Sequence, residues 1–69
     1  MSAQEVEALI ARFPVCPICL VNPPEHVDHD HKTGRVRGVP CFTCNAAIGQ
    51  LRDDPEIARR AAAYLEGVA

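Results

Sequence analysis

Hydrophobic residues near the N-terminus recur at the spacing of one helix face. Ser2 and Glu5 stand three residues apart, as the partners of a capping box do at a helix start. The apolar positions are Val6, Leu9, Ile10 and Phe13. Because they share one side of a helix and Pro14 opposes its continuation, the pattern predicts an amphipathic helix over residues 2–13.

A second helical pattern occupies the C-terminal end of the chain. Asp54 can cap a helix that begins at Pro55, and Glu56 suits its first turn. The apolar stripe consists of Ile57, Ala61, Tyr64, Leu65 and Val68. These features predict a C-terminal helix over residues 55–67. The two terminal helices could cover the centre of the chain or pair two copies into a homodimer, and the pattern favours neither.

Between these two predicted helices, the pattern of apolar and polar residues changes from helical spacing to that of short strands. Residues 27–31 and 35–39 are strand candidates, joined by a turn in which Gly34 supplies conformational freedom. From Phe42 the spacing becomes helical again up to Leu51. The expected fold is therefore small α+β, a single domain over residues 1–69 whose core spans residues 16–51 and is flanked by N- and C-terminal helices.

Cysteine spacing predicts what holds this core together. A chain of 69 residues with three aromatic side chains builds little hydrophobic core by itself. Its four cysteines form two C-x2-C pairs: Cys16, Cys19, Cys41 and Cys44. Because no signal peptide or membrane-spanning segment is recognisable, we expect a cytoplasmic chain, and in that reducing compartment the pairs predict one structural zinc site with four thiolate ligands.

Histidines and acids are concentrated in the six residues 26–31, which include the first strand candidate. They are His26, Asp28, His29, Asp30 and His31. Carboxylates bind divalent ions, and an imidazole beside such an ion can act as a general base near neutral pH. The alternative is a solvated strand end whose histidines have no chemical role.

Asn45 follows the last cysteine directly, so a zinc site would hold it in a defined place relative to the strands. Its amide oxygen is a ligand that magnesium accepts together with a carboxylate, which Asp28 would supply. Gly49 lies one helical turn further on the same face and leaves room for a phosphate backbone. Alternatively, Asn45 only caps the helix and Gly49 only relieves packing.

Charge is unevenly distributed in a chain whose formal net charge is −2. No acid occurs between positions 32 and 52, whereas this stretch carries four cations: Lys32, Arg35, Arg37 and Arg52. Such a surface suits contact with DNA phosphates. Because a zinc ion bound by four thiolates leaves the site with two negative charges, some cations could instead compensate it.

Five motifs occur together in one order. They are Cys16-Pro-Ile-Cys19, Val27-Asp28-His29-Asp30-His31, Thr33-Gly34-Arg35-Val36-Arg37-Gly38, Cys41-Phe-Thr-Cys44-Asn45 and Ile48-Gly49. This combination resembles the recombination endonuclease VII family of HNH nucleases. The resemblance implies a ββα-metal core with a structural zinc and a separate Mg2+ or Mn2+ ion held by Asp28 and Asn45. It also implies that His29 activates water and that His31 lies near the scissile phosphate, whereas His26 and Asp30 have no certain role.

The leading hypothesis is thus a metal-dependent HNH DNA endonuclease that nicks DNA or resolves junctions. A phage origin, which the resemblance suggests, would place it in the host cytoplasm. A noncatalytic zinc module that binds nucleic acid or a partner protein is the alternative from another class. A cysteine-based redox protein is a third, because C-x2-C pairs also serve in thiol chemistry.

Overall fold

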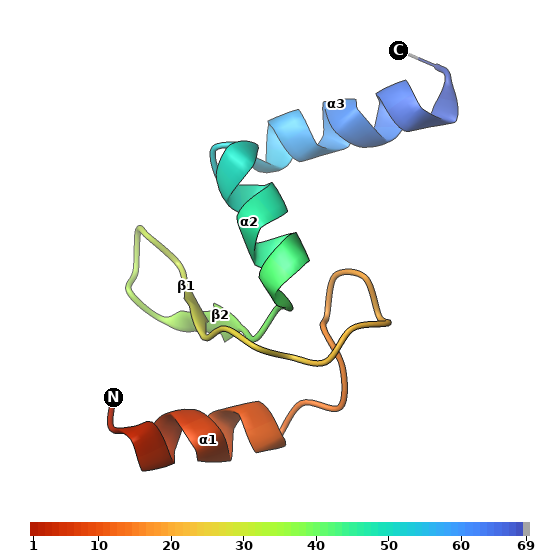
Figure 1. Ribbon diagram of the computed structural model, residues 1–69. Helices are drawn as coiled ribbons and strands as arrows, with labels where there is room; N and C mark the ends of the chain where they lie inside the picture. Colours follow the sequence, from red (N-terminus) through yellow and green to blue (C-terminus); the bar gives the residue numbers. More distant parts are fainter. Residues whose placement is uncertain (69) are drawn as a thin grey trace.

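The computed structural model describes residues 1–68 and shows three helices and one two-stranded antiparallel sheet (Figure 1). In chain order the elements are α1 (Ala3–Ala11), β1 (Asp28–His29), β2 (Val36–Gly38), α2 (Phe42–Gln50) and α3 (Pro55–Glu66). The molecule is elongated, measuring 44 × 27 × 14 Å, with α1 and α3 at opposite ends. The expected small α+β fold with flanking helices is confirmed.

Both terminal helices begin as their capping residues predict. The Glu5 backbone N–H donates to Ser2 Oγ at 3.1 Å, and Glu5 Oε1 accepts from the Ser2 backbone at 3.3 Å. Asp54 accepts a hydrogen bond of 2.8 Å from the backbone of Glu56. Gly67 ends α3 in the left-handed region at φ 81°. α1 ends at Ala11 rather than at residue 13, because Pro14 disfavours helical backbone at the preceding residue.

The strands are shorter than the sequence predicts because the hairpin loop includes residues expected in each. Asp30 Oδ1 accepts from the backbone of Lys32 at 2.7 Å and of Thr33 at 3.2 Å. The Asp30 carbonyl accepts from Gly34, which has φ 76°. Asp30 thus forms an Asx turn at the start of the loop, and the backbone hydrogen bonds from Lys32 and Thr33 lower its pKa.

The hairpin also contains a register shift. Asp28 pairs with Gly38, but His29 pairs with Val36, so Arg37 is an extra residue in β2. Consecutive residues of a regular strand point to opposite faces, and the extra residue makes the side chains of β2 around Arg37 depart from this alternation. Bulges redirect side chains and occur often at functional sites. The shift lies opposite Asp28 and His29, the two residues that the predicted site brings together.

The enclosed interior of residues 1–68 is very small. Cys16, Val39 and Cys41 are completely buried, and Pro40 beside them is buried as well. The Pro40 carbonyl accepts hydrogen bonds from the backbone of Glu25 and His26, which ties the approach to β1 to the approach to α2. The core therefore coincides with the cysteine cluster, as expected for a domain held together by a metal.

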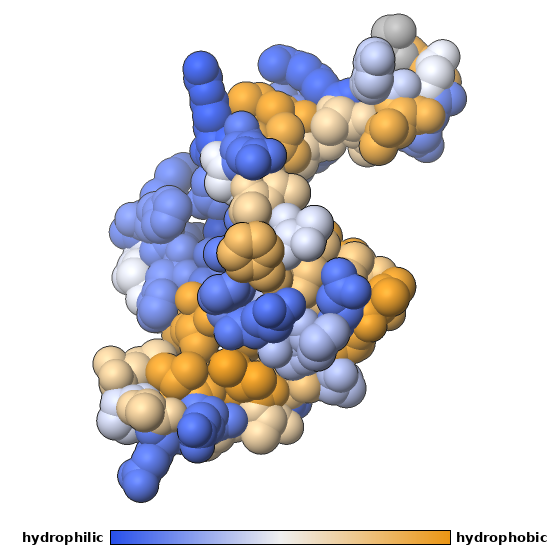
Figure 2. Space-filling view, in the orientation of Figure 1, coloured by the Kyte–Doolittle hydropathy of each residue, from blue (hydrophilic) through white to orange (hydrophobic). Residues whose placement is uncertain are grey.

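The terminal helices are only partly covered. The apolar residues of the N-terminal stripe are all half-buried: Val6, Leu9, Ile10 and Phe13. On α3, Ile57 and Ala61 are half-buried, whereas Tyr64 and Leu65 are 76% and 84% exposed. Figure 2 shows hydrophilic side chains gathered over the hairpin loop, and hydrophobic and hydrophilic ones side by side along α3. No helix within residues 1–68 has the length and apolar character needed to cross a bilayer.

Candidate metal and nucleic-acid site

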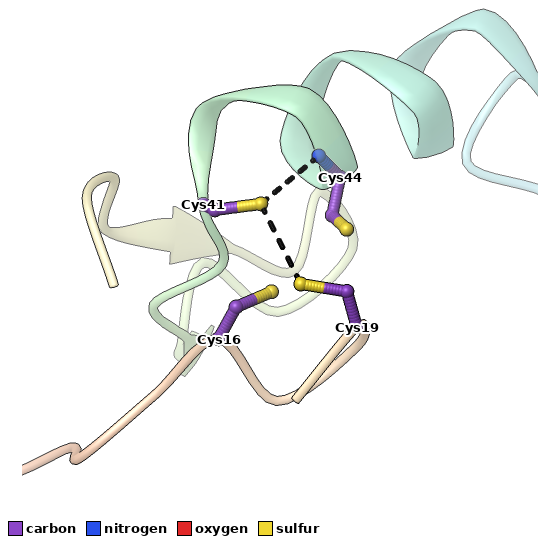
Figure 3. Close-up of side chains that lie close together, drawn as sticks. All are labelled: Cys16, Cys19, Cys41 and Cys44. Atoms are coloured by element: carbon purple, nitrogen blue, oxygen red, sulfur yellow. Dashed lines mark hydrogen bonds between the residues drawn. The ribbon is translucent and has the colours of Figure 1, made fainter. Parts of the chain in front are cut away.

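The four cysteine side chains converge from two loops and the start of α2 (Figure 3). All four sulfur atoms lie within 4.8 Å of one another, and those of Cys19 and Cys41 are 4.0 Å apart. Zinc–sulfur bonds of ~2.3 Å in a tetrahedron separate the sulfurs by about 3.8 Å. The cysteines are free, and the spacing exceeds the ~2.05 Å of a disulfide bond. The distances between the sulfur atoms are therefore compatible with a zinc ion bound by all four cysteines.

Backbone N–H groups point at these sulfurs. Cys41 is the N-cap of α2, and its Sγ accepts from the Cys44 backbone at 3.4 Å. Cys16 Sγ accepts from Ile18, and Cys19 Sγ accepts from Asn22, each at 3.4 Å. N–H donors stabilise thiolates, the form of cysteine that binds metal. The local backbone is thus arranged for anionic sulfur ligands.

Titration of the thiols reflects this arrangement. Burial raises the pKa of Cys16, but backbone hydrogen bonds outweigh it and bring the pKa to about 6. The backbone hydrogen bond from Cys44, with a further bond from the Asn22 side chain, lowers the pKa of Cys41. The side-chain hydrogen bond between Cys44 and Cys41 raises the pKa of the Cys44 thiol to about 12. Of these three thiols, Cys16 therefore gives up its proton readily, whereas Cys44 retains its proton.

Asn22 and Glu25 support the cluster and were not identified from the sequence. Asn22 Nδ2 lies 3.5 Å from Cys41 Sγ, and the Asn22 carbonyl accepts from the Cys16 backbone at 2.8 Å. Glu25 Oε1 accepts from the first N–H of α2, at Phe42. The two side-chain contacts join residues 17 or more positions apart, so no local pattern predicts them.

Asp28 is held by an arginine. Arg37 Nε donates to Asp28 Oδ2 at 2.7 Å, and the Asp28 side chain is 14% exposed. No residue among the described ones donates to the other oxygen, Oδ1. His29, the next residue, is exposed, and its ring has no hydrogen-bond partner within residues 1–68. One oxygen of Asp28 and the imidazole of His29 are thus available for chemistry.

Asp53 is the second acid of this network and was not identified from the sequence. Its carboxylate accepts two hydrogen bonds from Arg37, at 2.6 and 3.2 Å, which lower the pKa of Asp53. His31 Nδ1 lies 3.6 Å from Asp53 Oδ2. The sequence contained no signal for this pairing, because Asp53 directly precedes the helix cap Asp54, where the pattern is typical of a loop.

Asn45 is half-buried in the first turn of α2, where its backbone N–H donates to the Cys41 carbonyl. The cysteine cluster therefore does constrain the turn that carries Asn45. A Cβ added at Gly49, on the same helix face, would meet no atom within 4 Å. Packing does not explain this glycine, and the space beside it is open.

Replacing Gly49 with alanine is expected to stabilise the protein by about 0.5–1 kcal/mol, because glycine weakens a helix interior by that amount. If the chain is the DNA endonuclease hypothesised from the sequence and a phosphate backbone approaches here, the added methyl group is also expected to slow cleavage. Urea denaturation and a nicking assay measure the two effects. Gln50→Ala, at the exposed next position, is the control. A stabilised Gly49→Ala protein with undiminished nicking would exclude a close approach.

The remaining histidine and cations occupy the surface. The His26 ring packs against Phe42 with centroids 5.8 Å apart. Lys32, Arg35 and Arg52 are exposed, and within residues 1–68 none of their side chains forms an ion pair. Arg37 differs from them, since two carboxylates engage its guanidinium group. Contact of Arg37 with phosphate stays a prediction.

Comparison with known proteins identifies the family of the chain. The sequence model of the family described as recombination endonuclease VII matches residues 2–67. The chain belongs to the recombination endonuclease VII family. The resemblance seen in the motifs is thereby confirmed, and the match extends through both terminal helices.

Two curated relatives of this endonuclease VII family member come from phages. The Gene 59 protein of Mycobacterium phage L5 is 55% identical over 40 residues, and the Gene 59 protein of Mycobacterium phage D29 is 58% identical over 40 residues. Each match covers 56% of this chain and 24% of the relative, so the chain matches about a quarter of their length. No solved structure matches the chain.

Proposed function

We propose that this endonuclease VII family member is a metal-dependent DNA endonuclease with an HNH-type ββα-metal core. The proposal rests on one observation: the cysteine cluster is directly connected to the two elements that bear the candidate catalytic residues. Cys41 caps α2, which carries Asn45, and the neighbouring Pro40 carbonyl binds the backbone that leads into Asp28 and His29. A zinc ion at the cluster would fix these elements relative to one another.

The donor set suits two different metals. Four thiolates favour zinc, whereas a carboxylate and an amide are hard oxygen ligands. Within residues 1–68 the four cysteines are the only group of three or more His, Cys, Asp or Glu residues close enough for shared coordination. The catalytic Mg2+ or Mn2+ would therefore be held by Asp28 and Asn45 together with water and substrate, as magnesium commonly is.

In the proposed reaction the imidazole of His29 accepts a proton from water. The water oxygen bonds to phosphorus while the bond from phosphorus to the leaving 3′ oxygen breaks. A bound divalent ion supplies stabilisation of the charge that develops on the phosphate and the leaving oxygen. His31, 3.6 Å from Asp53, would lie beside the scissile phosphate.

DNA would meet the hairpin side of the molecule. Lys32 and Arg35 belong to the hairpin loop and Arg52 to the connection after α2, and these three cations have the freedom to contact phosphates. The exposed apolar residues of α3 support pairing of two chains through the terminal helices. The phage relatives support action in the host cytoplasm.

Zinc-loaded protein is expected to nick supercoiled plasmid, or to cut branched DNA, only when Mg2+ or Mn2+ is added. Gel electrophoresis of plasmid and of a four-way junction measures the two activities. If folded, zinc-bound protein binds DNA but cuts neither substrate with either ion, the enzyme proposal is wrong and a noncatalytic zinc module replaces it.

A further inference from the structure

Arg37 lies at the centre of a network that the proposed reaction leaves unexplained. Its Nε donates to Asp28, and its two terminal nitrogens donate to Asp53. The side chains of Arg37, Asp28 and Asp53 are only 38%, 14% and 23% exposed, respectively. Paired, partly buried charges of this kind hold their geometry better than exposed ion pairs.

The backbone has an uncommon conformation at both ends of the network. Arg37 is the extra residue at the register shift of the hairpin. Asp53 follows Arg52 in two consecutive left-handed conformations, with φ 60° and 56°, and its backbone N–H closes the end of α2 on the Ile48 carbonyl. Non-glycine residues seldom adopt this conformation, and Asp is among those that tolerate it. Two uncommon backbone features thus converge on one ion pair.

We propose that Arg37 and Asp53 are positioning residues for the catalytic ion, an inference that rests on the proposed endonuclease function. Arg37 occupies Oδ2 of Asp28 and leaves Oδ1 for the metal. Asp53 accepts two hydrogen bonds from Arg37 and thereby fixes the position of its side chain. These bonds also connect the hairpin to the end of α2, the helix that carries Asn45. Ligating carboxylates are commonly oriented by such hydrogen bonds, whose loss lowers metal affinity or activity about 10–100-fold.

The sign of the effect separates positioning from plain electrostatics. Removing a positive charge beside a cation site should strengthen cation binding by Coulomb's law. Positioning predicts the reverse: Arg37→Ala should bind Mn2+ about 10–100-fold more weakly. Calorimetric titration of Mn2+ into zinc-loaded protein without DNA measures this directly. Unchanged or tighter binding by Arg37→Ala would overturn the inference.

Matched variants sharpen the test. Arg35→Ala removes the same charge from the hairpin without touching Asp28, so its Mn2+ affinity should not fall, and an equal loss there would also overturn the inference. Asp53→Ala should weaken Mn2+ binding, and combining it with Arg37→Ala should cause no further loss, because Asp53 acts through Arg37. Additive losses would refute that coupling.

Two further results keep this inference distinct from the proposed function and from misfolding. If the wild-type protein shows no Mn2+ site and cuts neither plasmid nor junction DNA with either ion, the proposed function itself fails. If Arg37→Ala does not retain zinc, Arg37→Lys carries the test, since lysine keeps the charge but lacks the fork that reaches both carboxylates. Saturating Mn2+ should restore nicking by Arg37→Ala with an unchanged KM for DNA, whereas a raised KM that Mn2+ does not correct would assign Arg37 to phosphate contact.

Discussion

Removal of zinc is expected to unfold the region from residue 16 to residue 51. Cys16 and Cys41 are two of the three fully enclosed apolar side chains among the described residues, so metal binding and core formation are nearly one event. Structural zinc sites in small domains contribute about 10–16 kcal/mol, as much as the entire stability of a typical domain. The terminal helices, with nine and twelve residues, are too short to persist alone.

Circular dichroism during chelation, with zinc content measured in parallel, tests this expectation. Cys41→Ser is an informative variant because serine is itself a good N-cap, so the start of α2 is retained while a thiolate is lost. Thr43→Ser, an exposed change between the two ligands of the same C-x2-C, is the control. An unchanged thermal transition after verified loss of zinc would contradict a structural role. Withholding Mg2+ should leave the fold intact.

His29→Ala is expected to lower the nicking rate by about 10²–10⁴-fold, the usual contribution of a general base. The His29 side chain is exposed and has no hydrogen-bond partner in the described part of the chain, so its loss should leave stability and zinc content unchanged. Mn2+ affinity should also stay unchanged. In contrast, Asp28→Ala and Asn45→Ala should weaken Mn2+ binding as well as the rate.

Single-turnover nicking rates and Mn2+ calorimetry on these proteins provide the comparison. Val36→Ala is the matched control, since Val36 pairs with His29 across the hairpin and is 39% exposed. Wild-type nicking by His29→Ala would remove His29 from the mechanism. A loss of Mn2+ binding in that variant would instead make His29 a ligand.

Local patterns account for what could be predicted of the fold. Capping boxes, N-caps and C-x2-C spacings involve residues within four positions of each other, and the structure confirms the starts of α1 and α3 and the clustering of the cysteines. The strand lengths were overestimated because Asp30 makes an Asx turn that competes with strand pairing.

By itself, the sequence determined the order of elements, the four-cysteine cluster and the family, because each depends on which residues occur in recognisable motifs in a fixed order. Only the tertiary structure decided that Arg37 joins Asp28 to Asp53, nine and sixteen positions away. That network depends on a register shift in the hairpin and on left-handed backbone after α2. No glycine marks the positions of these features, Arg37, Arg52 and Asp53, and the ion pair between Arg37 and Asp53 forms only because the fold brings the hairpin to the end of α2.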